Sequence, residues 1–107
     1  MLILPIKKKW YDMILSGEKK EEYREIKQYY IARFQNETVS EWWCNFDGAI
    51  KIYPQKIEIL FRNGYSSSSP SFKAVCELTA GTGKEEWGAE KDKEYFVLKI
   101  QKIDKEI

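Results

Sequence analysis

Residues 17–24 of the chain are Gly17-Glu18-Lys19-Lys20-Glu21-Glu22-Tyr23-Arg24, a charged stretch that begins with glycine. The apolar residues before it recur at the spacing of one helix face, at Ile6, Trp10, Met13 and Ile14. We therefore predict a helix over 7–16. Gly17 ends this helix, because glycine readily takes the left-handed conformation of a helix C-terminus. The residues that follow, 19–26, are predicted to form a strand.

Three of the charged residues in this stretch form a cation–carboxylate–cation set: Lys19, Glu22 and Arg24. In an extended chain Glu22 and Arg24 point to the same face, whereas Lys19 has to reach that face from the turn before the strand. Charges are buried at low cost only when they are paired and hydrogen-bonded. We expect the three side chains to line one concave surface and to be partly buried.

The spacing Gly17-x-Lys19-x-x-Glu22-x-Arg24 after an apolar helix resembles the ASCH domain (activating-signal-cointegrator homology), a small relative of the PUA domain. The resemblance extends over nearly the whole chain, because a short strand precedes the helix and an apolar strand closes the sequence. It implies an α+β fold, a PUA-like, mainly antiparallel β-barrel with one or two helices at its rim. It also implies a cleft, lined by the motif, that accepts RNA, nucleotides or modified bases.

The rest of the chain predicts a single domain, 1–107, with helices first and strands clustered later, an order that favours a mainly antiparallel, barrel-like sheet. Alternating apolar residues and turn signals predict strands at 2–6, 56–62, 72–79 and 94–103 and a short helix at 27–35. Gly81-Thr82-Gly83 is expected to break the third of these strands, and Asn63-Gly64 to form a turn. Residues 36–55 are hard to assign, apart from a turn at Asp47-Gly48.

The composition narrows the classes of function. The chain has no histidine, and its two cysteines, Cys44 and Cys76, are too few and too far apart for a thiolate zinc site. We expect neither a metal nor a cofactor. The net charge is +1, with +3 in residues 1–35, which suits a few phosphates but no long tract of duplex DNA. No apolar run is long enough for a membrane span and no signal-peptide pattern is present, so a cytoplasmic location without membrane contact is expected.

Further candidate ligand-binding residues lie at the start of the first helix and around the Asn63-Gly64 turn. Lysines at a helix start oppose the helix dipole, so Lys7 and Lys9 are predicted to face an anion such as a phosphate. A solvated surface cluster is the alternative. Arg62 can bind a phosphate or a carboxylate, and Asn63 can bind the edge of a base.

The aromatic residues divide into two groups. Tyr65 and Trp87 lie in predicted loops, where such rings can stack on bases, and we assign them to the ligand site. The residues on apolar faces are predicted to be core, and they include Trp10, Phe61, Phe72 and Phe96.

Three functions remain open. The first is weak to moderate binding of RNA, a nucleotide or a modified nucleoside, with Lys19 and Arg24 supplying charge and Glu22 accepting hydrogen bonds. The second is a small amidohydrolase acting on an acylated nucleoside, with Lys19 and Glu22 as catalytic residues. Part of the ASCH family is associated with that reaction and uses a threonine three residues after the lysine, where this chain has Glu22. The third is a structural charge network without a ligand. The sequence indicates no oligomeric state.

Overall fold

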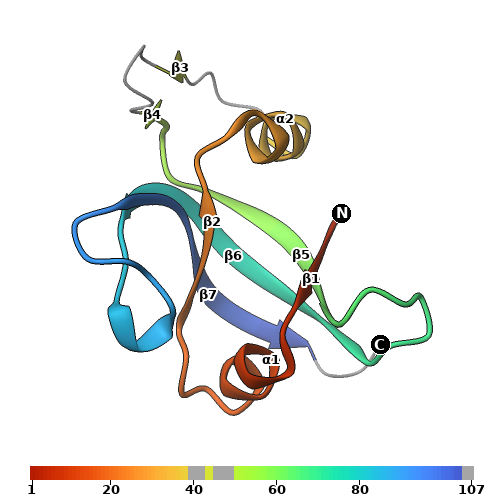
Figure 1. Ribbon diagram of the computed structural model, residues 1–107. Coiled ribbons are helices and arrows are strands. Elements are labelled where there is room, and N and C mark those ends of the chain that lie inside the picture. Colours follow the sequence, from red (N-terminus) through yellow and green to blue (C-terminus); the bar gives the residue numbers. More distant parts are fainter. Residues whose placement is uncertain (39–42, 45–49, 105–107) are drawn as a thin grey trace.

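The computed structural model describes residues 1–38, 43–44 and 50–104, which form an α+β fold (Figure 1). Its elements, in chain order, are β1 (Leu2–Ile6), α1 (Lys8–Leu15), β2 (Glu21–Glu25), α2 (Gln28–Asn36), β3 (Trp43–Cys44), β4 (Ile50–Lys51), β5 (Gln55–Asn63), β6 (Ser71–Thr82), the 3-10 helix η1 (Glu85–Trp87) and β7 (Glu94–Asp104). In the described part, no helix is long and apolar enough to cross a membrane. The turn expected at Asp47-Gly48 lies outside the described residues.

One sheet of five strands makes up most of the fold, in the order β1-β5-β6-β7-β2. β1 is parallel to β5, and the pairs β5–β6, β6–β7 and β2–β7 are antiparallel. The sheet curls into a half-barrel whose two edge strands are β1 and β2 (Figure 1). β3 and β4 form a separate antiparallel pair. The prediction of a mainly antiparallel, barrel-like α+β fold is confirmed at this level.

The predicted elements match the observed ones to within two residues, with one correction. Gly81 does not break its strand, because Gly81 pairs with Tyr95 and Thr82 pairs with Glu94, so that β6 continues to Thr82. No heavy atom lies within 4 Å of the position that a Cβ of Gly81 would occupy, so the glycine is simply extended strand backbone. The helix end at Gly17 is confirmed by its φ of +86°.

The core lies between the sheet and the two helices. Side chains of β5 and β6 alternate between buried and more exposed positions, as the sequence predicted, and the buried ones are Ile57, Ile59, Phe61, Phe72, Ala74, Cys76 and Leu78. α1 packs Tyr11 against Phe72, with ring centroids 5.0 Å apart, and α2 packs Phe34 against Phe96 at 4.8 Å. Trp10 corrects the prediction for the aromatic residues, because it is only partly buried and lines the cleft described below.

Candidate functional site

The three charges of the motif form one ion-paired set, here called the charge triad (Lys19, Glu22 and Arg24). Glu22 Oε1 lies 2.9 Å from Lys19 Nζ, and Glu22 Oε2 accepts a hydrogen bond from Arg24 Nη2 at 2.9 Å. Glu22 and Arg24 come from one face of β2, and Lys19 comes from the turn before it. The side chains of Lys19, Glu22 and Arg24 are 0%, 8% and 14% exposed. Arg24 is partly buried, as expected, whereas Glu22 and Lys19 are more deeply buried than expected.

The ammonium of Lys19 is enclosed by oxygen acceptors and aromatic rings. Besides its contact with the triad carboxylate, Nζ donates hydrogen bonds to the carbonyl oxygens of Glu21 at 2.6 Å and Trp87 at 3.1 Å. An ammonium has three donors, so these three partners satisfy it. The ring centroids of Trp10 and Tyr23 each lie 5.0 Å from Nζ. Burial lowers the pKa of Lys19, and the neighbouring carboxylate opposes that shift.

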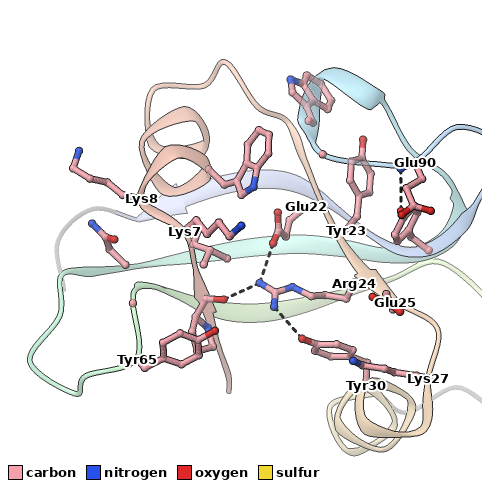
Figure 2. Close-up of a pocket in the computed structure, with 18 of the residues that line it drawn as sticks. Lys7, Lys8, Glu22, Tyr23, Arg24, Glu25, Lys27, Tyr30, Tyr65 and Glu90 are labelled. Atoms are coloured by element: carbon pink, nitrogen blue, oxygen red, sulfur yellow. Dashed lines mark hydrogen bonds and ion pairs between the residues drawn. The ribbon is translucent and has the colours of Figure 1, made fainter.

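Arg24 bridges the opening between the two edges of the sheet. Its Nη2 donates a second hydrogen bond to the carbonyl oxygen of Pro5 on β1 at 3.0 Å, and its Nη1 donates to Tyr30 Oη on α2 at 3.1 Å (Figure 2). Arg24 Nε is buried and has no hydrogen-bond partner among the described residues. The guanidinium therefore joins β1, β2 and α2 at one point.

A cleft of about 600 Å³ opens beside the charge triad. It is bordered by the start of α1, β2, the start of α2, the turn after β5 and the segment around η1 (Figure 2). The volume lies within the range of small-molecule sites, about 300–1,000 Å³. Six of the residues that the sequence assigned to a ligand site line this cleft: Lys7, Glu22, Arg24, Asn63, Tyr65 and Trp87.

The other three predicted site residues do not line the cleft. Lys19 lies beneath the carboxylate of Glu22, with no exposed side-chain surface. Lys9 is exposed, and its Nζ lies 4.6 Å from the centroid of the Trp10 ring. Arg62 precedes Asn63 in β5, so the two side chains point to opposite faces of the strand. Arg62 Nε is also buried without a hydrogen-bond partner among the described residues.

Several lining residues were not predicted as site residues. They are Pro5, Ile6, Lys8, Trp10, Tyr23, Glu25, Lys27, Tyr30, Gly64, Gly88, Glu90, Lys93 and Tyr95. The helical spacing of Trp10 marked it as core, although its three lysine neighbours were a signal for a polar surface. Tyr23 lies between Glu22 and Arg24 in the motif, which was the available signal for its position. Tyr30 and Lys27 reach the cleft only because α2 packs beside β2, and no local pattern predicts that.

Tyr23 fixes the segment around η1 against β2. Its hydroxyl donates to Glu21 Oε1 at 2.8 Å and accepts a hydrogen bond from the backbone N–H of Lys84 at 2.9 Å. Burial raises the pKa of Tyr23, so the hydroxyl remains a donor well above neutral pH. Gly83 packs so closely that a Cβ there would lie 2.6 Å from two carbon atoms of the Tyr23 ring. Glycine at this position therefore allows one wall of the cleft to close on Tyr23.

The lining combines positive charge with aromatic rings. Five lining side chains are cationic and three are carboxylates, which leaves a net charge of +2. Six of the 19 lining residues are Trp or Tyr, whereas aromatic residues make up 15% of the whole chain. Stacking on such rings and attraction to such cations suit a ligand with a flat ring and one or two negative charges. Among the described residues, no group of three or more Cys, Asp or Glu side chains could hold a metal ion.

Comparison of the chain with protein-family models, with curated proteins and with solved structures finds no match.

Proposed function

We propose that the chain is a small ASCH-type domain with a PUA-like fold, and that it binds a nucleotide or a modified nucleoside in the cleft beside the charge triad. The observation that carries this proposal is that six Trp and Tyr residues and five cationic residues line one cleft. The motif charges Glu22 and Arg24 lie in the lining of that cleft, where the resemblance to ASCH domains requires them. The curled, mainly antiparallel sheet with two helices is compatible with a PUA-like barrel.

The phosphate of the ligand is bound at the ends of the two helices. Lys7 and Lys27 are the N-cap residues of α1 and α2, neither makes a side-chain capping bond, and both line the cleft. Each helix N-terminus carries a partial positive charge, to which the lysine adds a full one. Two positive helix ends facing one cleft therefore favour an anionic group between them, and this explains why lysines replace the usual capping residues.

The base of the ligand stacks on the loop aromatics. Tyr65 is 90% exposed on the turn after β5, so its ring is accessible from the cleft. Trp87 lines the cleft from η1 and is held in place by the hydrogen bond from Lys19 to its carbonyl oxygen. Asn63 adds an amide that can bind a base edge or a sugar hydroxyl.

The geometry favours binding over the amidohydrolase alternative. A catalytic Lys19 must reach the substrate, whereas its Nζ contacts three oxygens and its side chain has no exposed surface. The third alternative, a structural network, describes Lys19 well but does not account for the fact that Glu22 and Arg24 line the cleft. We therefore assign Lys19 to the support of the site, and Glu22 and Arg24 to contact with the ligand.

A titration with nucleoside monophosphates tests this function. Trp10 and Trp87 line the cleft, so their fluorescence reports on its occupancy. We expect saturable binding in the micromolar range or weaker at low salt. If GMP, AMP, CMP and UMP and a short single-stranded RNA all leave the fluorescence unchanged and release no heat on calorimetric titration, the proposed function is wrong.

A matched pair of tyrosine variants shows whether the ligand binds in the cleft or elsewhere on the surface. Tyr65→Ala removes a stacking ring in the cleft, and we expect affinity to fall about tenfold, since a base–aromatic stack contributes about 1–3 kcal/mol. Tyr53 is 75% exposed and does not line the cleft, so Tyr53→Ala should leave affinity unchanged. Equal effects of the two substitutions would contradict the assignment of the cleft.

A further inference from the structure

Glu22 places a fixed pair of acceptor atoms in the lining of the cleft. Its side chain is 8% exposed, and each carboxylate oxygen already lies 2.9 Å from one cation of the triad. A carboxylate has about four lone-pair positions, so each oxygen keeps the capacity to accept another hydrogen bond. Because the cations of Lys19 and Arg24 hold the group from two sides, its orientation is set before any ligand arrives, and this pre-organisation favours specific recognition.

The charges around Glu22 determine which hydrogen-bond donors of a ligand can bind its carboxylate. Lys19 and Arg24 give the triad a net charge of +1, and the cleft lining as a whole has a net charge of +2. An ammonium or guanidinium group on a ligand would be repelled by Arg24 at this position. Neutral N–H groups are not repelled, and a neutral donor bonded to a carboxylate makes a stronger hydrogen bond than one bonded to a neutral acceptor.

We infer that the ligand is a guanine nucleotide, whose neighbouring N1–H and N2–H donors bind the carboxylate of Glu22. The inference rests on the proposed function and names the base that the site selects. Adenine and cytosine each place an acceptor nitrogen beside the amino group, and uracil flanks its N3–H with two carbonyl oxygens. Each of these edges would set an acceptor against the carboxylate, whereas guanine presents two adjacent donors.

Base analogues test the inference with the unaltered protein. GMP, IMP, 1-methyl-GMP and AMP are titrated under one set of conditions. IMP lacks the 2-amino group and 1-methyl-GMP lacks the N1–H. Each analogue therefore makes one hydrogen bond fewer to the charged carboxylate of Glu22. We expect each to bind about tenfold more weakly than GMP, because hydrogen bonds to charged groups contribute about 1.5–3 kcal/mol. AMP should bind more weakly still.

The outcomes separate the inference from the function on which it rests. If all four nucleotides bind equally, guanine recognition is overturned and the proposed nucleotide-binding function stands. If IMP or AMP binds more tightly than GMP, the inference is also overturned. If none of the four binds, both the inference and the proposed function are overturned.

A variant of Glu22 tests whether this side chain causes the preference for guanine. Glu22→Gln keeps the shape but turns an amide NH₂ toward a donor edge, so the preference for GMP over IMP should disappear while AMP affinity changes little. Glu58→Gln is the matched control, because Glu58 pairs with Lys73 at 3.3 Å and does not line the cleft. Thermal unfolding shows whether each variant is folded. A folded Glu22→Gln protein that keeps the preference overturns the inference, and the analogue series decides if that variant does not fold.

Discussion

Arg24 on β2 donates a hydrogen bond to the backbone carbonyl oxygen of Pro5 on β1, across the gap between the two edge strands of the sheet. Proline has no N–H group, so a carbonyl oxygen is the one backbone hydrogen-bonding group that β1 offers at this position. The same guanidinium binds Glu22 and Tyr30. A side chain thus joins the two edges where a closed barrel would have a backbone ladder, and the cleft opens at this gap.

Arg24→Lys should destabilise the protein, because an ammonium cannot reproduce the planar set of donors that contacts Glu22, Pro5 and Tyr30. We expect the free energy of unfolding to fall by about 1–3 kcal/mol, measured by urea denaturation. The control is Arg33→Lys, since Arg33 donates one exposed hydrogen bond to the carbonyl oxygen of Tyr29. Similar losses in the two variants would show that the bridge from β2 to β1 contributes no more to the free energy of unfolding than an exposed hydrogen bond does.

Lys19→Arg should also destabilise the protein, although it keeps the charge. The Lys19 side chain has no exposed surface, and its Nζ fits between three oxygens and two aromatic rings, so a larger guanidinium overfills the site. Overpacking of this kind costs about 1–3 kcal/mol. Lys20 is the next residue and is exposed, so Lys20→Arg should leave the unfolding midpoint unchanged. Equal midpoints for the two variants would contradict the enclosed position of Lys19.

Two glycines in one segment should respond differently to the same substitution. A Cβ on Gly83 would lie 2.6 Å from the Tyr23 ring and 2.8 Å from Ala89 Cβ, so Gly83→Ala has to displace the wall of the cleft. We expect a loss of about 1–3 kcal/mol in the free energy of unfolding and weaker nucleotide binding. Gly81 has no neighbour within 4 Å of its Cβ position, so Gly81→Ala should be neutral or slightly stabilising. Thermal melts of both variants check this prediction.

The sequence predicted the parts of the fold that depend on local periodicity. The alternation around Ile57, Ile59 and Phe61 indicated a strand with one buried face, and Gly17 indicated the end of the first helix. The alternation of side chains along β5 also determines which of two predicted site residues lines the cleft. Asn63 lines the cleft and Arg62 does not, because neighbouring side chains in a strand point to opposite faces.

The contacts between distant segments could not be predicted in this way. Lys19 binds the carbonyl oxygen of Trp87, which is 68 residues away, and no local pattern carries that information. The prediction of Trp10 as a core residue was wrong for a related reason. Its helical spacing fits a core residue, yet it is only partly buried, and its ring centroid lies 5.0 Å from the ammonium of Lys19.

The thiol of Cys76 should make the free energy of unfolding fall as the pH rises into the alkaline range. Burial raises the pKa of Cys76 from 9.0 to about 12 in the folded protein. Between these values the unfolded state loses the proton and the native state keeps it, so stability is fully present below pH 9 and is lost as pH rises. The loss from this group approaches about 1.4 kcal/mol per pH unit.

Two core variants isolate that contribution. Cys76→Ala removes the thiol, so its free energy of unfolding should fall less steeply from pH 9 to 11 than that of the unaltered protein. Ile59→Val is the control, because Ile59 is fully buried and does not titrate. It should lower stability by about 0.5–1.5 kcal/mol at every pH. Parallel pH profiles for all three proteins would show that Cys76 does not titrate with unfolding.

The salt dependence of binding should reveal the small number of phosphates that the cleft can hold. With a net charge of +2 in the lining, about two phosphates of a short single-stranded oligonucleotide can be neutralised. Because each phosphate contributes about −0.7, log K should fall with log salt with a slope of about −1.4. Lys7 is the N-cap of α1 and lines the cleft, so Lys7→Gln should bring the slope about 0.7 closer to zero. Lys56 is exposed on β5 and does not line the cleft, so Lys56→Gln should leave the slope unchanged. If the two lysine variants change the slope equally, the oligonucleotide is held by the general surface charge and not by the cleft.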